Sequence, residues 1–317
     1  MKNLFRFFFI VLLTTTTANY VIAQSDGVCA VAGPEFVNTN QKGVGDQAVS
    51  RDPRVAVRYN NKGFDYTSEK KYAEAAACFL KAIDISPGFA LYHFNLGNAY
   101  FGLGRYDESR LEYEKALQAD NKYADAFHGL AGVQLVGGHF SEGLVLIDKA
   151  LDLSPQNPEY LATKGYFYIK LKDYDQAAKY LELSARLNPT EVKTLNDLGI
   201  VYSRMNKTSN AASIFEKAIA VDPSDPEAYN NLGTVLTSEK KYPQALAAFE
   251  SAARLGPDWP VAVYNLGICY LNCKNRTSAL ETQRTLQNLA PSLATKLFDT
   301  IFRGKVVDAS LLAGRDR

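Results

Sequence analysis

Hydrophobic positions along the chain follow a helical period, and the whole pattern returns every 34 residues. One stretch carries a helical face at i, i+3, i+4 and i+7, formed by His93, Leu96, Gly97 and Tyr100. A second face at i, i+4 and i+7 follows, formed by Ser109, Tyr113 and Ala116. Glycines in the intervening sequence "GLGRYD" interrupt the first helix. The pattern therefore predicts two antiparallel helices joined by a tight turn.

A small residue occupies the same position in every unit. Steps of 34 residues lead through Gly63, Gly97, Ala131, Gly165, Gly199, Gly233 and Gly267. Glycine inside a helix costs about 1 kcal/mol relative to alanine, so a repeated glycine predicts close packing of the second helix against the first. We number 34 slots in each unit and place this residue in slot 8. The units then begin at residues 56, 90, 124, 158, 192, 226 and 260.

The second helices and the unit ends repeat as well. A small, aromatic and small triplet appears as Ala75, Phe79 and Ala82, as Ala211, Phe215 and Ala218, and as Ala245, Phe249 and Ala252. Six of the seven units close with proline, at Pro87, Pro155, Pro189, Pro223, Pro257 and Pro291, and Asn121 fills the remaining slot. Proline cannot continue a helix, so it ends each unit.

This combination of residues at a 34-residue period resembles the tetratricopeptide repeat. The resemblance implies an all-α, right-handed superhelical solenoid of antiparallel helix pairs, with seven repeats over residues 56–291. The third unit departs from the pattern with Gln134, Gly143 and Ile147, and the seventh with Gln283 and Leu286. Residues 292–317 are expected to hold a capping helix and a tail, because Leu293, Leu297 and Ile301 are spaced four apart.

The N-terminal residues predict export. Lys2 and Arg6 precede a short apolar run, and small residues lead to a cleavage site after Ala23, which is the layout of a signal peptide over residues 1–23. The run is too short for a membrane span, which needs about 20 apolar residues. We therefore expect no membrane span in the mature chain and a periplasmic or secreted location. Residues 24–55 lack a helical period and are expected to form an irregular arm.

The net charge bears on nucleic-acid binding, and the cysteines bear on disulfide formation. The full chain has a formal charge of +1, and removal of residues 1–23 leaves −1, so the balance gives no support for nucleic-acid binding. Four cysteines remain, namely Cys29, Cys78, Cys269 and Cys273. An oxidising compartment permits a disulfide, but the spacing fixes none, and buried structural thiols are the favoured interpretation.

No pattern of catalytic or cofactor-binding residues stands out. The chain has no Gly-rich phosphate loop and no H-E-x-x-H sequence, and its paired glycines fall in turns. His93 and His128 occupy adjacent slots of neighbouring units, but packing histidines are more common than two-histidine metal sites without a carboxylate. We therefore expect no enzyme activity, no cofactor and no metal.

The resemblance implies that first helices line a concave groove for a peptide or a partner helix. The groove candidates are Asn61, Asn95, Asn231, Asn265, Phe94, Asn98, Phe101 and Tyr166, and the wall slots hold no basic cluster. Asparagines in slot 6 suit a peptide backbone because an amide both donates and accepts hydrogen bonds. A similar asparagine ladder lines the repeat domain of O-linked GlcNAc transferases. The alternative is that these asparagines brace neighbouring helices.

The sequence thus indicates an exported, noncatalytic protein-interaction scaffold. The alternative is a regulatory or substrate-recruiting subunit of an envelope enzyme that processes glycans or peptides. A third possibility is a secreted eukaryotic protein, because Asn206 and Asn275 begin glycosylation sequons. The partner's identity and the oligomeric state do not follow from the sequence.

Overall fold

A computed structural model describes residues 52–303, and every regular element in this range is an α-helix. The first unit contains α1 (Pro53–Ser68), α2 (Tyr72–Ile85), α3 (Ala90–Gly102), α4 (Tyr106–Ala119), α5 (Ala124–Gly137) and α6 (Phe140–Leu153). The second contains α7 (Pro158–Leu171), α8 (Tyr174–Leu187), α9 (Val192–Arg204), α10 (Thr208–Val221), α11 (Pro226–Ser238), α12 (Tyr242–Leu255), α13 (Pro260–Asn272), α14 (Arg276–Leu289) and α15 (Pro291–Arg303).

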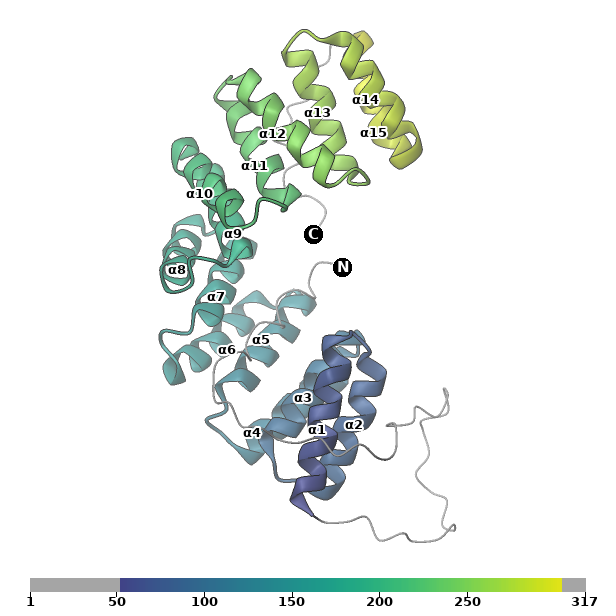
Figure 1. Cartoon of the computed structure of the whole chain (residues 1–317). Coiled ribbons are helices and arrows are strands. Elements are labelled where there is room, and N and C mark those ends of the chain that lie inside the picture. The colour runs from purple at the N-terminus through teal and green to yellow at the C-terminus, as the bar shows by residue number, and fades with distance from the viewer. Residues whose placement is uncertain (1–51, 304–317) are drawn as a thin grey trace. The chain divides into compact units, whose positions relative to one another are not determined.

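The chain divides into two compact units near Pro155, and each unit is a stack of helix pairs (Figure 1). Within each unit, the two helices of a pair pack on each other, and the second helix also packs on the first helix of the next pair. First helices of successive pairs touch as well, for example α9 with α11 and α11 with α13. First helices therefore run in the same direction within a unit, and the turns after them lie at one edge.

Every first helix ends in the same left-handed turn. The residue in slot 15 has a positive φ in all seven repeats, at Lys70, Gly104, Gly138, Lys172, Asn206, Lys240 and Lys274. The next backbone N–H reaches back five residues, as from Lys241 to the carbonyl of Leu236 at 2.9 Å. This is the hydrogen bond of a Schellman motif, which normally places glycine at the left-handed position. Four of the seven turns place lysine there instead.

Close contact at slot 8 is confirmed. A Cβ on Gly97 would lie 2.6 Å from a ring carbon of Tyr113, and one on Gly199 would lie 2.5 Å from Cε1 of Phe215. No side chain fits at such distances without displacing its neighbour. The glycine therefore allows the aromatic ring of the second helix to rest directly on the first helix.

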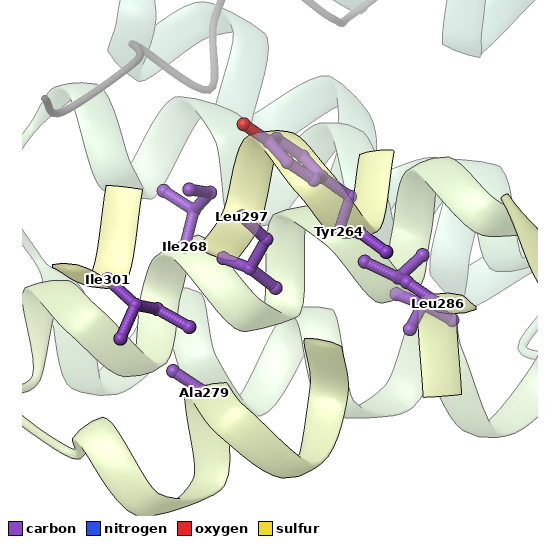
Figure 2. Close-up of a cluster of buried hydrophobic side chains, with 8 residues drawn as sticks. Tyr264, Ile268, Ala279, Leu286, Leu297 and Ile301 are labelled. Carbon is purple, nitrogen blue, oxygen red and sulfur yellow. The ribbon is translucent and has the colours of Figure 1, made fainter. Parts of the chain in front are cut away.

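The last repeat obtains this contact from the C-terminal helix. In the last repeat, the second-helix position that faces the glycine (slot 24) holds Gln283. A Cβ on Gly267 would meet Leu297 of α15 at 2.5 Å in place of a ring from the second helix. Leu297 and Ile301 join the buried cluster that covers the last repeat, which also contains Ile268 (Figure 2). The expected all-α repeat fold and its C-terminal capping helix are thus confirmed.

The cysteines divide into two groups. Cys269 and Cys273 are free thiols, as expected, and burial raises the pKa of Cys269 to about 12. Cys78 is fully buried but disulfide-bonded, so the expectation of a free thiol was wrong at this position. Its partner lies outside the described residues, as do the predicted signal peptide and nearly all of the predicted arm.

Candidate functional site: the face of the first helices

Asparagines in slot 6 connect neighbouring first helices in both units. In unit 1, Nδ2 of Asn95 on α3 donates to Oδ1 of Asn60 on α1 at 2.8 Å. In unit 2, Nδ2 of Asn265 on α13 donates to Oδ1 of Asn230 on α11 at 2.9 Å. All four residues are buried, and Asn265 is fully so. These amides therefore join successive repeats, which agrees with the bracing alternative.

The remaining slot-6 asparagines, Asn231 and Asn61, differ from Asn95 and Asn265. Asn231 is buried, and neither its Nδ2 nor Oδ1 of Asn196 has a hydrogen-bond partner. Nδ2 of Asn196 instead donates to Asp225 at 2.8 Å. Asn61 is exposed on α1, the first described helix. Among the predicted ladder residues, Asn61 is thus the one that offers its amide to solvent, and a role of the ladder in binding stays a prediction.

An aromatic and amide pair is open on α3. Phe94 is partly exposed and packs against Tyr113 and Tyr123, with ring centroids 5.8 and 5.3 Å away. One turn later, Asn98 is partly exposed and accepts a hydrogen bond on Oδ1 from the Tyr113 hydroxyl at 2.6 Å. Because the oxygen is engaged, the amide orientation is fixed and the NH₂ group remains as a donor. The supporting roles of Tyr113 and Tyr123 were not anticipated from the sequence.

Two predicted groove residues offer little surface. Phe101 is 5% exposed and packs edge-on against Tyr106 at 5.2 Å. Tyr166 is 6% exposed, and the ammonium groups of Lys170 and Lys193 lie 4.7 and 5.3 Å from its ring centroid. Cation–π contacts of this kind stabilise the ring's position. Both aromatic residues therefore serve mainly as packing residues in this structure.

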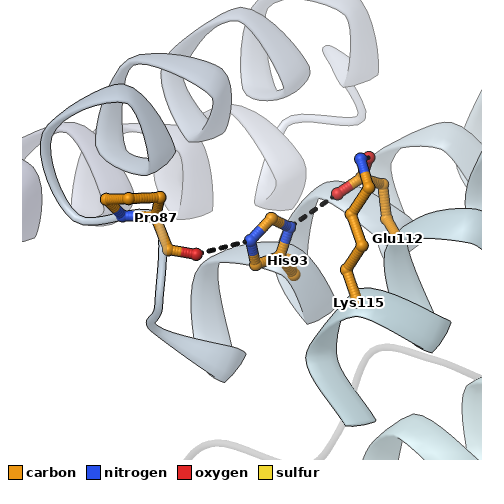
Figure 3. Close-up of polar contacts among 4 residues, drawn as sticks. All are labelled: Pro87, His93, Glu112 and Lys115. Carbon is orange, nitrogen blue, oxygen red and sulfur yellow. Dashed lines mark hydrogen bonds and ion pairs between the residues drawn. The ribbon is translucent and has the colours of Figure 1, made fainter. Parts of the chain in front are cut away.

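A buried ion pair joins α3 and α4 beside this face (Figure 3). Nδ1 of His93 lies 2.7 Å from Oε2 of Glu112, and Nε2 lies 2.9 Å from the carbonyl oxygen of Pro87. Both neighbours are acceptors, so both ring nitrogens donate when the ring is a cation. The hydrogen bond with Glu112 raises the pKa of His93, although burial opposes it. Lys115 also binds Glu112 at 2.7 Å.

The two histidines of the adjacent slots have different environments. Burial lowers the pKa of His128 to about 4, so its ring is neutral at physiological pH. His93 already has a partner at each ring nitrogen. Between residues 52 and 303, no group of three or more potential ligands among His, Cys, Asp and Glu is placed to hold a metal ion.

A recess of about 590 Å³ lies at the turns of unit 2, at the α7–α8 turn and next to Met205. None of the predicted groove residues lines it. Its lining shows that the turns after α7 and α9 are neighbours, because Lys172 and Met205 share it. Within the described part of the chain, no helix has both the length and the apolar character needed to cross a bilayer.

Sequence comparison identifies the repeats. Tetratricopeptide repeat models match residues 90–123, 158–191 and 196–260, and a TPR repeat model matches residues 63–104. A comparison with curated proteins gave no significant match.

Solved structures share the fold. PilF of Pseudomonas aeruginosa is 25% identical, with a TM-score of 0.60 over 67% of this chain and 96% of that chain. A tetratricopeptide repeat protein of Parabacteroides merdae is 17% identical, with a TM-score of 0.57 over 78% of this chain and 99% of that one. The match to the APC/C hetero-tetramer Cut9–Hcn1 is 19% identical, has a TM-score of 0.62 and covers 79% of this chain but 48% of that one. These structures share the fold of the chain. The family-model matches, together with the repeated residues, show that the chain belongs to the tetratricopeptide repeat family.

Proposed function

We propose that this protein is a noncatalytic scaffold that binds an extended peptide or a partner helix on the face of its first helices. The repeats support a role in protein–protein interaction, because such arrays present long surfaces rather than enclosed pockets. The observation that carries the finer proposal is the open pair of Phe94 and Asn98 on α3. The partly exposed ring of Phe94 packs on the rings of Tyr113 and Tyr123. Beside it, Asn98 has an NH₂ donor whose orientation is fixed by the hydrogen bond from Tyr113.

This pair suits a polypeptide on physical grounds. Binding is favoured when the contact groups are already ordered, because less conformational entropy is lost. Tyr113 orders both groups, since its ring packs against Phe94 and its hydroxyl binds Asn98. An apolar side chain of the partner would cover the Phe94 ring, and a backbone carbonyl would accept from Asn98. Aromatic anchors of this kind often dominate the energy of an interface.

Replacing both residues in a Phe94→Ala/Asn98→Ala variant is expected to weaken peptide binding at least tenfold, or about 1.4 kcal/mol. Peptides selected by display against the full chain serve as ligands, and fluorescence anisotropy gives the dissociation constants. The matched control is Phe298→Ala/Asn210→Ala, which removes an exposed phenylalanine and an exposed asparagine from α15 and α10. Equal affinities for the α3 variant and the control, with helicity intact in both, would contradict the proposed site.

We also propose that the protein is exported and that the mature chain starts at Gln24. The disulfide at Cys78 supports this, because disulfides persist in oxidising compartments and are rare in the cytosol. The alternative role as a subunit of an envelope enzyme shares this location, and no described residue favours it over the scaffold.

Export predicts a defined N-terminus. Expression of the full sequence in a bacterial host should yield a periplasmic product that begins at Gln24, as read by N-terminal sequencing. An Ala23→Arg variant should block cleavage, because the site requires a small residue before the cut. Retention of Met1 by the unmodified protein in the membrane fraction would refute the export proposal.

A further inference from the structure

Three successive turns at one edge of unit 2 carry an unusual concentration of positive charge. They follow α9, α11 and α13, and their exposed cations are Arg204, Lys207, Lys240, Lys241, Lys274 and Arg276. We call these six residues the basic strip. In the same turns, the only acidic residue is Glu239, whose carboxylate is already engaged by Lys241 at 2.8 Å and by Thr208. The contact of Glu239 with Thr208 also shows that the turns after α9 and α11 are adjacent.

The basic strip breaks two local rules of helix stability. Lys240 and Lys274 have φ values of 60° and 58°, in the left-handed region where a side chain strains the backbone and glycine does not. Lys207, Lys241 and Arg276 lie at the start of second helices, where the helix dipole favours acidic side chains. The other three cations of the strip lie at the ends of first helices, where the dipole favours a positive charge. The first turns of α10, α12 and α14 contain no acidic residue, whereas those of α2, α4, α6 and α8 do.

Left-handed lysines also occur at Lys70 and Lys172, but the helices that follow them carry an acidic residue in the first turn. Both departures coincide at the turns after α11 and α13, and this coincidence indicates a role other than folding. Lys240 and Lys274 form no ion pair with any described residue, and both are exposed. We propose that the basic strip is a second binding surface of this scaffold and that it takes an acidic segment of a partner polypeptide. It is distinct from the Phe94 and Asn98 pair, which lies in the other unit.

The dimensions suit an extended chain. Packed helices lie about 8–10 Å apart, so three successive turns span on the order of 20 Å. An extended polypeptide rises about 3.3 Å per residue, so about six residues cover the strip. Glutamates at alternate positions would point toward the same side and meet the cations of successive turns. We favour a polypeptide over a lipid surface because the repeat family implies protein partners.

The test uses the full chain and a fluorescein-labelled peptide of twelve residues in which glutamate alternates with serine. The Lys240→Gln/Lys241→Gln/Lys274→Gln variant should bind it at least tenfold more weakly than the unmodified protein. The control Lys179→Gln/Lys217→Gln/Lys296→Gln removes the same charge from exposed lysines of α8, α10 and α15 and should change binding less than twofold. Binding to the strip should weaken with added salt, since exposed charges are screened.

A second variant separates binding from folding. Lys240→Gly/Lys274→Gly removes the strained side chains, so its Tm should stay the same or rise while peptide binding falls. A lower Tm would show that the lysines support the turns and would contradict the proposal. Equal weakening by the control lysines, or no preference for the glutamate peptide over a glutamine version, would also overturn it. Strip-dependent binding to vesicles of anionic phospholipid without peptide binding would assign the strip to a membrane instead.

Discussion

Replacing Gly199 with valine is expected to lower the free energy of unfolding by about 3 kcal/mol, the upper end of the usual cost of overpacking. Even the first added carbon would lie 2.5 Å from the buried ring of Phe215, and the two methyl groups of valine need more space still. The ring cannot move aside easily, because it is 1% exposed and packs against Ala211 and Val235. The second helix must therefore shift away from α9.

Urea unfolding followed by circular dichroism measures this loss. Because each repeat is stabilised mainly by its neighbours, the variant should also unfold with a broader transition. Gly88→Val is the matched control, since a Cβ at Gly88 would meet no atom within 4 Å, and it should leave stability nearly unchanged. A sharp transition at the original urea concentration in Gly199→Val would show that the glycine contact does not limit packing.

A Glu112→Gln substitution is expected to destabilise unit 1 by about 3 kcal/mol at pH 5.5, the lower end of the cost of breaking a buried ion pair. Glu112 and His93 are each 8% exposed, so water replaces little of the lost interaction. Burial alone would raise the pKa of Glu112, but hydrogen bonds from His93 and Lys115 outweigh it and lower that pKa. The carboxylate is thus held in its charged form.

The effect should depend on pH in a defined direction. The pKa of His93 is raised from 6.5, so its contribution is complete below that value and is lost as pH rises through the folded-state pKa. The pKa of Glu112 is lowered from 4.5, so its contribution is complete above that value and is lost in stronger acid. The stability difference between wild type and variant should therefore shrink from pH 5.5 to pH 9.

Urea unfolding at both pH values tests this expectation. The control is Glu114→Gln, which breaks a more exposed pair with Arg110 at 3.1 Å and should cost less than about 1 kcal/mol. A constant difference between pH 5.5 and pH 9 for Glu112→Gln would mean that His93 is not charged in the folded protein.

The fold could be predicted from the sequence because the same residue types occur at the same slots in most repeats. Gly199 and Phe215 recur at fixed slots, and their contact is short-range, so the pattern specifies helix, turn and packing together. The disulfide at Cys78 could not be predicted, because cysteine spacing does not fix pairing.

The candidate site was less predictable than the fold. Asn95 and Asn61 both occupy slot 6, yet the amide of Asn95 is hydrogen-bonded to Asn60 and the side chain of Asn61 is exposed. The difference arises because Asn61 has no described repeat before it. Burial of Phe101 likewise depends on Tyr106, a neighbour outside the wall slots. The slot pattern could not reveal that Tyr113 orients Asn98, because this hydrogen bond joins two helices.

The Tyr113 ring has a consequence for how such an array can change in evolution. Its ring fills the space above Gly97 and also above Gly129, where a Cβ would lie 2.6 Å from Cζ. The latter glycine lies in slot 6 of the next repeat, where four of the other six repeats carry asparagine. A repeat with asparagine in that slot could not follow Tyr113 without a clash. The modules are therefore not interchangeable, and duplication or shuffling at this point would require paired substitutions in adjacent copies.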